Sequence, residues 1–537
     1  MWWICVANKL KDNREKSMKQ LPIGISTLEE VRAKNHTYVD KTKHVFNLVE
    51  ANKYYFLSRP RRFGKSLLLD TIKQAFLGRK DLFTGLYLEN NWDWSVKHPV
   101  IHLDFGTSSA YESKQRWLTD VHNTLNLCAE IYGVALSQTD YGAKFGELIR
   151  KLAQHIGQKV VVLIDEYDKP ILDNITNLNI AIEIREMLKG FYTYIKSNDE
   201  YLKFVLLTGV SKFSKVSLFS GLNILDDISL TKKYADICGY TQSELESEFA
   251  EYLEDGNVDK RELKTWYNGY NFAGTEEQKV YNPFDILLFF SKNYEYRAYW
   301  FETATPTFLV KLLQSKHYFI PNLEKVVVSD NQLSSFDIDN IPLLTLLFQT
   351  GYLTIDKPTK IGTQYAYVLR YPNLEVKASL NNSLLEIGAE LHCKNQNSYD
   401  LSIALNENSF DQLKIILGSH FASIPHDWYR KNDIANYEGF YASVVYSYLA
   451  ALGYELIAED VTNHGKIDLT IIMPDKILIF EFKLIKHGTA AEAIEQIKAK
   501  GYPQKYHSTG KPIHLIGISF DPEIKSVTEL SHECCCI

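Results

Sequence analysis

The sequence predicts an α/β fold built from more than one domain, and three observations support this prediction. The chain has 537 residues, which exceeds what one hydrophobic core usually organises and suggests domains of roughly 150 residues each. Its first third alternates short apolar runs with longer helical patterns, as sheets covered by helices do. Its C-terminal part returns to this alternation after a helical and strongly aromatic middle.

Four apolar runs predict the strands of the first domain. They are nearly continuous rather than alternating, which is typical of strands buried on both faces and therefore of a parallel sheet with helices on each side. The first run is followed by a turn and then by a helical pattern over 66–76. The four predicted strands are 54–57, 100–104, 160–164 and 204–208.

The middle of the chain is predicted to be helical. The helical region extends from about 240 to 347, and β-rich pieces at 351–355 and 365–371 predict the wing of a winged-helix module. A helical connector is expected over 376–435.

The C-terminal region is predicted to be a second α/β domain. Helices are expected at 437–451 and 489–499, with strands between them and a last strand at 513–518. The predicted domains are 18–235, 236–375, 376–435 and 436–530.

The composition is that of an average globular protein. Apolar residues make up 45% and charged residues 23% of the chain, which excludes global disorder and fibrous architectures. The net charge of −7 argues against a surface coated in nucleic-acid contacts, but a local basic cleft is compatible with it because phosphate attraction depends on local charge. No apolar run approaches the roughly 20 residues of a membrane-spanning helix, so no membrane partner is expected.

The cysteines indicate a reducing compartment, and we expect a cytoplasmic protein. Seven cysteines in a chain of this length make no disulfide framework, and no two internal ones have the CxxC spacing of a zinc site. The chain ends in Cys534-Cys535-Cys536-Ile537, which has prenylation spacing but an unusual final residue. We expect a mobile tail there, with a lipid anchor or a metal-binding thiol cluster as alternatives.

A phosphate-binding loop is predicted between the first strand and the helix that follows it. Gly64-Lys65-Ser66 matches the end of the G-x-x-x-x-G-K-[ST] motif, while Arg59 takes the place of the first glycine. Backbone amides and the helix N-terminus can hold phosphate in this context. Lys65 would meet the β- and γ-phosphates of a nucleotide, and Ser66 would offer its hydroxyl to Mg²⁺. The alternative is a basic turn with an incidental Gly-Lys-Ser.

The third predicted strand ends in an acidic pair. At this place a P-loop enzyme holds magnesium with one carboxylate, here Asp165, and activates the attacking water with the next, here Glu166. The fourth strand ends at Thr208, where a polar side chain could sense the γ-phosphate. Acidic turns after buried strands also occur without function, but the upstream loop favours the functional interpretation.

A second set of charged residues lies in the C-terminal region. Asp468 is expected to open one strand, and Glu481 and Lys483 to close the next. Residues i and i+2 of a strand share a face, so Glu481 and Lys483 project to one side, and pairing in a hairpin brings Asp468 near that side. Two carboxylates can hold one or two Mg²⁺ ions that polarise a phosphodiester, and the lysine would orient the water or offset charge.

The spacing of these three residues alone favours a hairpin with a solvated, salt-bridged edge. The order of helix, strand, strand, helix and strand instead fits a nuclease core. Between His464 and Lys511 there are eight lysines and five acidic residues, a local basic excess that suits a phosphate-bearing partner.

The chain resembles a family of bacterial and archaeal proteins that pair an AAA-ATPase-like domain with a C-terminal PD-(D/E)XK nuclease-like domain. In this family the loop sequence RPRRFGKS is the usual form, so Arg59 does not mark a decayed motif. The resembling segments are LPIG at 21–24, YVDKT at 38–42, RPRRFGKS at 59–66, LIDEYD at 163–168, TGVS at 208–211, WYNGY at 266–270, YNP at 281–283 and LFQTGYL at 347–353.

The resemblance implies a P-loop AAA-ATPase-like domain that binds ATP and Mg²⁺, and a restriction-endonuclease-like C-terminal domain. It also implies Glu438 as a third acidic ligand, and Gln496 could support the same site. The aromatic residues of WYNGY are expected to pack a small helical lid rather than to stack on a ligand. The residues expected to bind ATP are Arg59, Arg62, Phe63, Gly64, Lys65, Ser66, Asp165 and Thr208, and the expected metal ligands are Ser66, Asp165, Glu438, Asp468 and Glu481.

The sequence therefore predicts an ATPase joined to a magnesium-dependent nuclease-like domain that acts on nucleic acid, with DNA favoured over RNA. Glu166, Glu481 and Lys483 are the expected catalytic residues. ATPases of this class often complete their site with a neighbouring subunit, so a homo-oligomer is expected. The alternative is a nucleotide-gated binding or signalling switch without nuclease activity, and a role associated with transposons or defence is a weaker third hypothesis.

Overall fold

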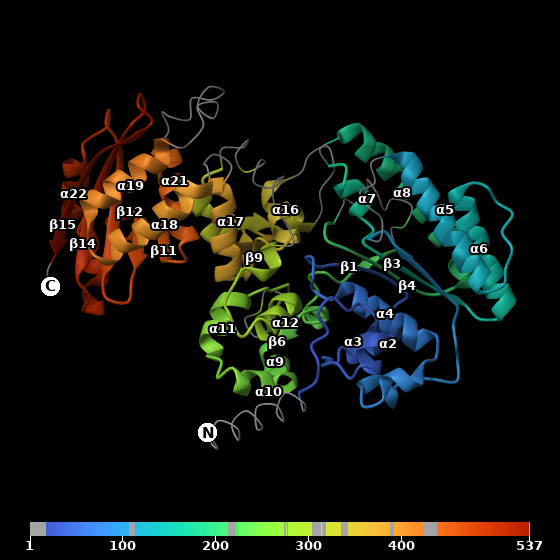
Figure 1. Cartoon of the computed structure of the whole chain (residues 1–537). Helices are drawn as coiled ribbons and strands as arrows, with labels where there is room; N and C mark the ends of the chain where they lie inside the picture. Colours follow the sequence, from blue (N-terminus) through green and yellow to red (C-terminus); the bar gives the residue numbers. More distant parts are fainter. Residues whose placement is uncertain are drawn as a thin grey trace, which may run out of the picture. The chain divides into compact units, whose positions relative to one another are not determined.

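A five-stranded parallel sheet organises the first part of the chain in the computed structural model (Figure 1). The four predicted strands are all present, and a short fifth strand joins them at the edge. In order across the sheet, the strands are β2 (Val100–Asp104), β3 (Val160–Asp165), β4 (Leu202–Gly209), β1 (Tyr54–Ser58) and β5 (Asp226–Asp227). All neighbouring strands are parallel, as the continuous apolar runs predict.

The chain divides into two compact units. The first contains Met1–Trp300 and Val327–Val368, and the second contains Phe301–Val326 and Leu369–Ile537. The predicted boundaries of the four domains stay predictions. The structure describes residues 18–106, 113–175, 177–212, 222, 224–272, 275, 278–302, 313, 318–334, 342–386, 391–422 and 438–535.

Helices cover both faces of the parallel sheet. In Figure 1, α5 (Lys114–Ile131), α6 (Tyr141–Ile156) and α8 (Leu178–Ser197) lie on one side, and α2 (Leu28–Ala33), α3 (Thr42–Ala51) and α4 (Lys65–Phe76) on the other. Helix α6 illustrates why these segments are helical. Asp140 caps its first turn by accepting a hydrogen bond from the Ala143 amide (2.8 Å). Phe145, Leu148 and Leu152 are spaced so that they form one buried face.

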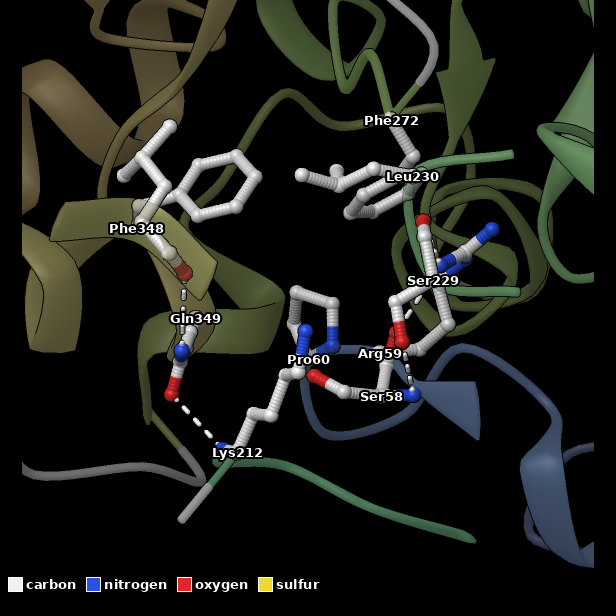
Figure 2. Close-up of a pocket in the computed structure, with 10 residues that line it drawn as sticks. Ser58, Arg59, Pro60, Lys212, Ser229, Leu230, Phe272, Phe348 and Gln349 are labelled. Carbon is white, nitrogen blue, oxygen red and sulfur yellow. Dashed lines mark hydrogen bonds between the residues drawn. The ribbon is translucent and has the colours of Figure 1, made fainter. Parts of the chain in front are cut away.

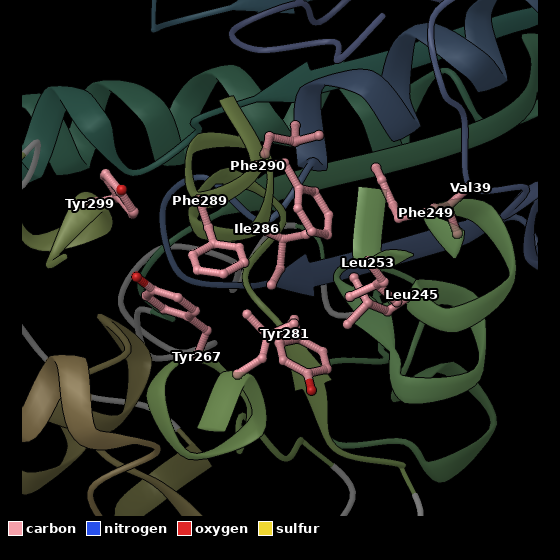
Figure 3. Close-up of a cluster of buried hydrophobic side chains, with 12 residues drawn as sticks. Val39, Leu245, Phe249, Leu253, Tyr267, Tyr281, Ile286, Phe289, Phe290 and Tyr299 are labelled. Carbon is pink, nitrogen blue, oxygen red and sulfur yellow. The ribbon is translucent and has the colours of Figure 1, made fainter. Parts of the chain in front are cut away.

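A helical subdomain with an aromatic core follows the sheet. It contains α9 (Gln242–Glu248), α10 (Ala250–Asp255), α11 (Lys260–Tyr267), α12 (Pro283–Ser291) and α13 (Tyr299–Glu302). Figure 3 shows Tyr267 near Phe289 in its core, which also contains Tyr281 and Ile286. Trp266 packs against the same cluster, and Tyr270 is buried against Phe63. The expectation that the WYNGY aromatics serve packing is therefore confirmed.

A small sheet and two helices complete the first part of the chain. Helices α15 (Asp330–Ser334) and α16 (Leu343–Gln349) precede a hairpin of β9 (Thr354–Ile361) and β10 (Gln364–Arg370), and β8 (Val326–Ser329) pairs with β10. Helices followed by a hairpin are compatible with the winged-helix prediction, which stays a prediction.

The strand predicted from residue 351 begins later than expected. The amides of Tyr352 and Leu353 both donate to the carbonyl of Leu347 (2.8 and 3.1 Å), so residues 351–353 close helix α16. These residues satisfy the last carbonyl groups of the helix, and the backbone is free to pair as a strand only from Thr354.

The second unit is built on a five-stranded mixed sheet. Its strands, in order, are β11 (Glu455–Thr462), β12 (Gly465–Ile472), β13 (Ile477–Leu484), β14 (Ile513–Asp521) and β15 (Ser526–Cys535). Only β13 and β14 are parallel, and helix α22 (Ala490–Ala499) connects them. Its described residues also form the α-helices α17 (Leu374–Glu386), α18 (Leu391–Asn406), α19 (Phe410–Ala422) and α21 (Glu438–Ala451).

Two expectations about the end of the chain are wrong. Strand β14 is not the last, and the tail is not mobile as far as Cys535, because β15 pairs with β14 along its length. Cys534 lies opposite His514, and Cys535 opposite Ile513. The final residues 536–537 lie outside the described residues, as does the first residue of the helix predicted from 437. None of the described helices combines the length and the apolar character needed to cross a membrane.

Candidate functional site

The loop after β1 has the backbone shape of a phosphate-binding loop. It leaves the sheet at Ser58 and enters α4 at Lys65. Gly64, just before the helix, has φ +90°, and Arg62 has φ +68°. Nothing lies within 4 Å of where a side chain would begin at Gly64, so glycine is favoured there by its backbone angle rather than by lack of space. The N-terminus of α4 is thereby placed beneath the loop, where a helix favours anions.

Lys65 points back into this loop. Its side chain is only 6% exposed, and its Nζ donates to the carbonyl oxygens of Arg59 and Pro60, both at 3.0 Å. Burial lowers the pKa of the Lys65 ammonium, and the nearby carboxylates of Asp165 and Glu166 oppose this effect. Within the described residues, this ammonium donates its hydrogen bonds to neutral carbonyl groups, which suits a cation that receives phosphate.

Two hydroxyl groups from different elements converge on Asp165. Ser66 Oγ, at the start of α4, donates to Asp165 Oδ2, and Thr208 Oγ1, near the end of β4, donates to Asp165 Oδ1, both at 2.6 Å. Strand β4 lies between β1 and β3 in the sheet, so the carboxyl ends of three parallel strands bring these groups together. Asp165 is 1% exposed. In P-loop proteins, a magnesium ion bound to nucleotide phosphate is held by a hydroxyl and a carboxylate that lie beside the lysine of the loop. Ser66, Asp165 and Lys65 have this arrangement.

Glu166 follows Asp165 in a strained turn. Its φ is +49°, and its amide donates to Asp165 Oδ1 (3.0 Å). Burial raises the pKa of Glu166, Lys65 opposes the rise, and the carboxylates of Asp165, Asp168 and Asp104 add to it. A carboxylate with a raised pKa, next to a carboxylate that could hold magnesium, is suited to accept a proton from water.

Arg59 lies in a different place from the one expected of a phosphate ligand. Its side chain is 1% exposed, and its guanidinium donates to the carbonyl oxygens of Ser58 and Ser229 (2.8 Å each) and of Tyr234 (3.0 Å). It also stacks over the ring of Phe272 at 4.1 Å, and burial lowers its pKa to about 10. Figure 2 shows Arg59 beside Ser229 and Phe272. These contacts indicate that Arg59 braces the loop from within the protein.

Phe63 and Arg62 also have structural contacts. Phe63 is 1% exposed and packs edge to face on Tyr270, with ring centroids 4.8 Å apart. The guanidinium of Arg62 lies 4.7 Å from the ring centroid of Phe284, and Arg62 is exposed at the loop. Of the predicted ATP-binding side chains, Lys65, Ser66, Asp165 and Thr208 therefore lie together, whereas the side chains of Arg59 and Phe63 support the loop.

The second candidate site lies in the mixed sheet of the other unit. Asp468 lies in the middle of β12 rather than at its start, and it accepts a hydrogen bond from the Phe482 amide (2.7 Å). Glu481 lies on the neighbouring β13 and accepts a hydrogen bond from Gln496 of α22. Lys483 Nζ is 3.6 Å from Glu481 Oε1. The predicted residues of β12, β13 and α22 thus meet, with Asp468 contributed from within its strand.

The electrostatics of this second site favour a cation. Glu481 is 2% exposed, and its Oε2 atom has no hydrogen-bond partner among the residues that the structure describes. Burial raises the pKa of both Asp468 and Glu481, and Asp468 adds to the rise at Glu481, while Lys483 lowers both. Ionisation of two buried carboxyl groups side by side is unfavourable. A bound divalent cation would offset both negative charges and so stabilise the ionised pair.

Glu438 stands apart from this pair in the described geometry. It is the first residue of α21, and its Oε2 atom accepts a hydrogen bond from the Leu484 amide (3.3 Å). Its charge still raises the pKa of Asp468. Within the described parts of the chain, no three carboxylate, imidazole or thiol groups stand close enough to hold a metal ion without moving. The donor types fit Mg²⁺, and Glu438 would have to turn to join the other two.

Sequence patterns did not identify two residues that shape the nucleotide site. Asp168 lies three residues beyond Asp165 and contacts the turn after β4. Asp104 ends β2 at the same edge of the sheet, and its charge acts on Glu166. An acidic residue at the end of a predicted parallel strand was the available signal for Asp104, because such ends share one edge.

Comparison with known proteins matches a family to each of the two regions that carry the candidate sites. Residues 22–219 match the family described as predicted AAA-ATPase, and residues 436–529 match the PD-(D/E)XK nuclease superfamily. A protein of Azotobacter chroococcum mcd 1, described as "Uncharacterized protein in vnfD 5'region", is 48% identical over 516 residues, which are 95% of this chain and 98% of the relative. The chain therefore belongs to the family of proteins that join a predicted AAA-ATPase domain to a C-terminal PD-(D/E)XK nuclease superfamily domain.

Proposed function

We propose that the chain binds and hydrolyses ATP with Mg²⁺ at the loop after β1, and that its C-terminal domain cleaves nucleic-acid phosphodiesters with a divalent metal. DNA is favoured over RNA as the substrate. The observation that best supports the ATPase part is the convergence of Ser66 and Thr208 on Asp165 beside the buried Lys65. The predicted homo-oligomer and cytoplasmic location stay predictions.

Each side chain of the nucleotide site has a role that follows from its position. Lys65 would exchange its two carbonyl contacts for phosphate oxygens, which pair with its charge more strongly. Ser66 and Asp165 would hold Mg²⁺, which offsets the charge of the phosphates. Glu166 would accept a proton from the attacking water, and Thr208 would place its hydroxyl near the γ-phosphate.

The nuclease part is supported best by the buried Oε2 atom of Glu481, which lies near Asp468 and has no hydrogen-bond partner in the described part of the chain. Asp468 and Glu481 would hold a divalent cation, which supplies Lewis-acid activation of the phosphodiester and of a bound water. Lys483, on the same face of β13 as Glu481, would orient the water or offset the charge that develops on the phosphate. Gln496 would keep Glu481 in the orientation that faces the cation.

The Glu166→Gln variant tests the ATPase part. Glutamine cannot accept the proton of the attacking water, so turnover should fall about 100-fold or more while ATP still binds. Steady-state phosphate release and equilibrium binding of a fluorescent ATP analogue with Mg²⁺ give the two values. If both proteins bind ATP tightly and neither hydrolyses it, the ATPase proposal is wrong and the alternative of a nucleotide-gated switch is favoured.

Cleavage of DNA and RNA with Mg²⁺ or Mn²⁺, with and without ATP, tests the nuclease part. Asp468→Ala and Lys483→Ala should each abolish cleavage, because one removes a metal ligand and the other the charge beside Glu481. Lys414→Ala, which removes a lysine of α19 outside the basic 464–511 segment, is the matched control and should cleave as the parent does. No cleavage by the parent protein under any of these conditions would end the nuclease proposal.

A further inference from the structure

Asp168 is a buried carboxylate to which the proposed mechanism assigns no role. It follows the acidic pair in the segment LIDEYD and is 1% exposed. Its Oδ2 atom accepts hydrogen bonds from the Ser211 amide and the Ser211 hydroxyl, both at 2.6 Å, and from the Val210 amide at 3.1 Å. A buried carboxylate is costly unless several donors satisfy it, and here the turn after β4 supplies three.

Tyr167 joins the same two turns. Its amide donates to the Thr208 carbonyl (3.0 Å), and its phenolic hydroxyl donates to the Ser211 carbonyl (2.9 Å). Its ring is buried edge to face against Phe56 of β1. The turn after β3 and the turn after β4 are thus fastened to each other on both sides of Gly209.

Gly209 makes this close approach possible. A side chain at this position would begin 2.5 Å from Asp168 Oδ1 and 2.6 Å from the ring of Tyr167. Only glycine lets the backbone of the β4 turn lie against these two side chains. The close contact between the two turns therefore depends on the sequences of both, DEYD at 165–168 and TGVS at 208–211.

The fastened turn begins at the residue whose hydroxyl reaches Asp165. Thr208 donates to Asp165 Oδ1 from one side (2.6 Å), while the residues that follow it are held by Asp168 from the other. Asp165 and Asp168 belong to one turn, so a fixed distance between the two turns fixes the Thr208 hydroxyl against the magnesium-binding carboxylate.

We propose that Asp168 is a positioning residue for ATP hydrolysis, which acts by holding the 208–211 turn so that the Thr208 hydroxyl faces the γ-phosphate. This inference rests on the proposed ATPase function. Asp168 does not touch the nucleotide, because its carboxylate is buried and engaged with the turn. Its effect on the reaction passes through Thr208.

The test compares the parent, Asp168→Asn, Thr208→Ala and the double variant. Asparagine keeps the size of Asp168 but removes its negative charge, so the hydrogen bonds that its single carbonyl oxygen accepts from Val210 and Ser211 become weaker and the turn loosens. Each single variant should lower kcat about 10-fold to 100-fold with KM and the ATP dissociation constant within about threefold of the parent, since small displacements of a positioned group act on the reaction step. The double variant should be no slower than the slower single variant, because both changes remove the same placement.

The inference would be overturned if the two decreases in kcat multiply in the double variant. It would also be overturned if a loss of ATP affinity accounts for the whole change in kcat/KM. Ser211→Ala removes one donor and leaves both backbone contacts, so it gives a milder decrease in kcat if Asp168→Asn fails to fold. Absence of turnover in the parent would refute the ATPase proposal and this inference together. Turnover in Asp168→Asn equal to that of the parent would refute the inference alone.

Discussion

At the scale of single residues, charged groups buried around the nucleotide loop have distinct kinds of partners. Arg59 is bound to carbonyl oxygens of the protein and is one of its largest buried side chains. Asp168 is bound to donors of a neighbouring turn. Lys65 is bound to two carbonyl groups of the loop itself, which a phosphate can replace. Burial alone therefore does not identify a ligand-binding group, and the nature of the partner does.

Glu147 illustrates a buried carboxylate whose role is stability. Burial opposes its ionisation, but the ion pair with Lys151 and hydrogen bonds from Ser137 and Gln138 outweigh this effect and lower its pKa to about 2. Between about pH 4.5 and pH 2 the unfolded chain would bind a proton that the folded chain does not, so this contribution to stability is present above about pH 4.5 and disappears as the pH falls toward 2.

The Glu147→Gln variant should therefore be less stable than the parent in a pH-dependent way. The difference in unfolding free energy should be about 1–3 kcal/mol near pH 7, because hydrogen bonds to a charged group are lost, and should shrink as the pH falls to about 3. Urea unfolding of both proteins between pH 3 and pH 7 measures it. A difference that stays constant over this range would contradict the assignment.

Single residues also set a limit on what the sequence could predict about the sites. Lys65, Ser66 and Asp165 were predictable because a loop, a helix start and a strand end are all visible as local patterns. Asp168 was not, because two of its three close donors are backbone amides 42 and 43 residues away, which leave no mark on residue type. For the same reason the carbonyl partners of Arg59 were hidden.

At the scale of elements, burial decides which strands the sequence reveals. Strands β1, β3 and β4 are buried almost throughout, and their apolar runs were recognisable. Strands β11 and β15 lie at the two edges of the mixed sheet, are partly exposed and contain many polar residues, so neither was predicted individually. An edge strand pairs on one side only and needs no continuous apolar run. An edge strand forms because it pairs with a neighbouring strand, and the local sequence pattern carries no information about that neighbour.

At the scale of the whole molecule, the two sites belong to different compact units. The loop of Lys65 is built on the parallel sheet of the first unit, and Asp468 and Glu481 on the mixed sheet of the second. Each unit has its own buried core, shown by the aromatic cluster around Tyr267 and by the aliphatic cluster around Ile479. A ligand that binds one folded unit stabilises that unit by mass action, whether or not the other unit binds anything.

Ligand-induced stabilisation should therefore separate the two sites in the full-length protein. ATP with Mg²⁺ at about 100 times its dissociation constant should stabilise the first unit by about 2.7 kcal/mol, and Mn²⁺ without nucleotide should stabilise the second. Lys65→Ala should abolish the shift with ATP and keep the shift with Mn²⁺, whereas Asp468→Asn should do the reverse. Differential scanning calorimetry resolves the transitions, and Lys486→Ala controls for loss of an exposed lysine. Loss of both shifts in either variant would contradict the independence of the two sites, because a substitution in one site would then abolish ligand binding at the other.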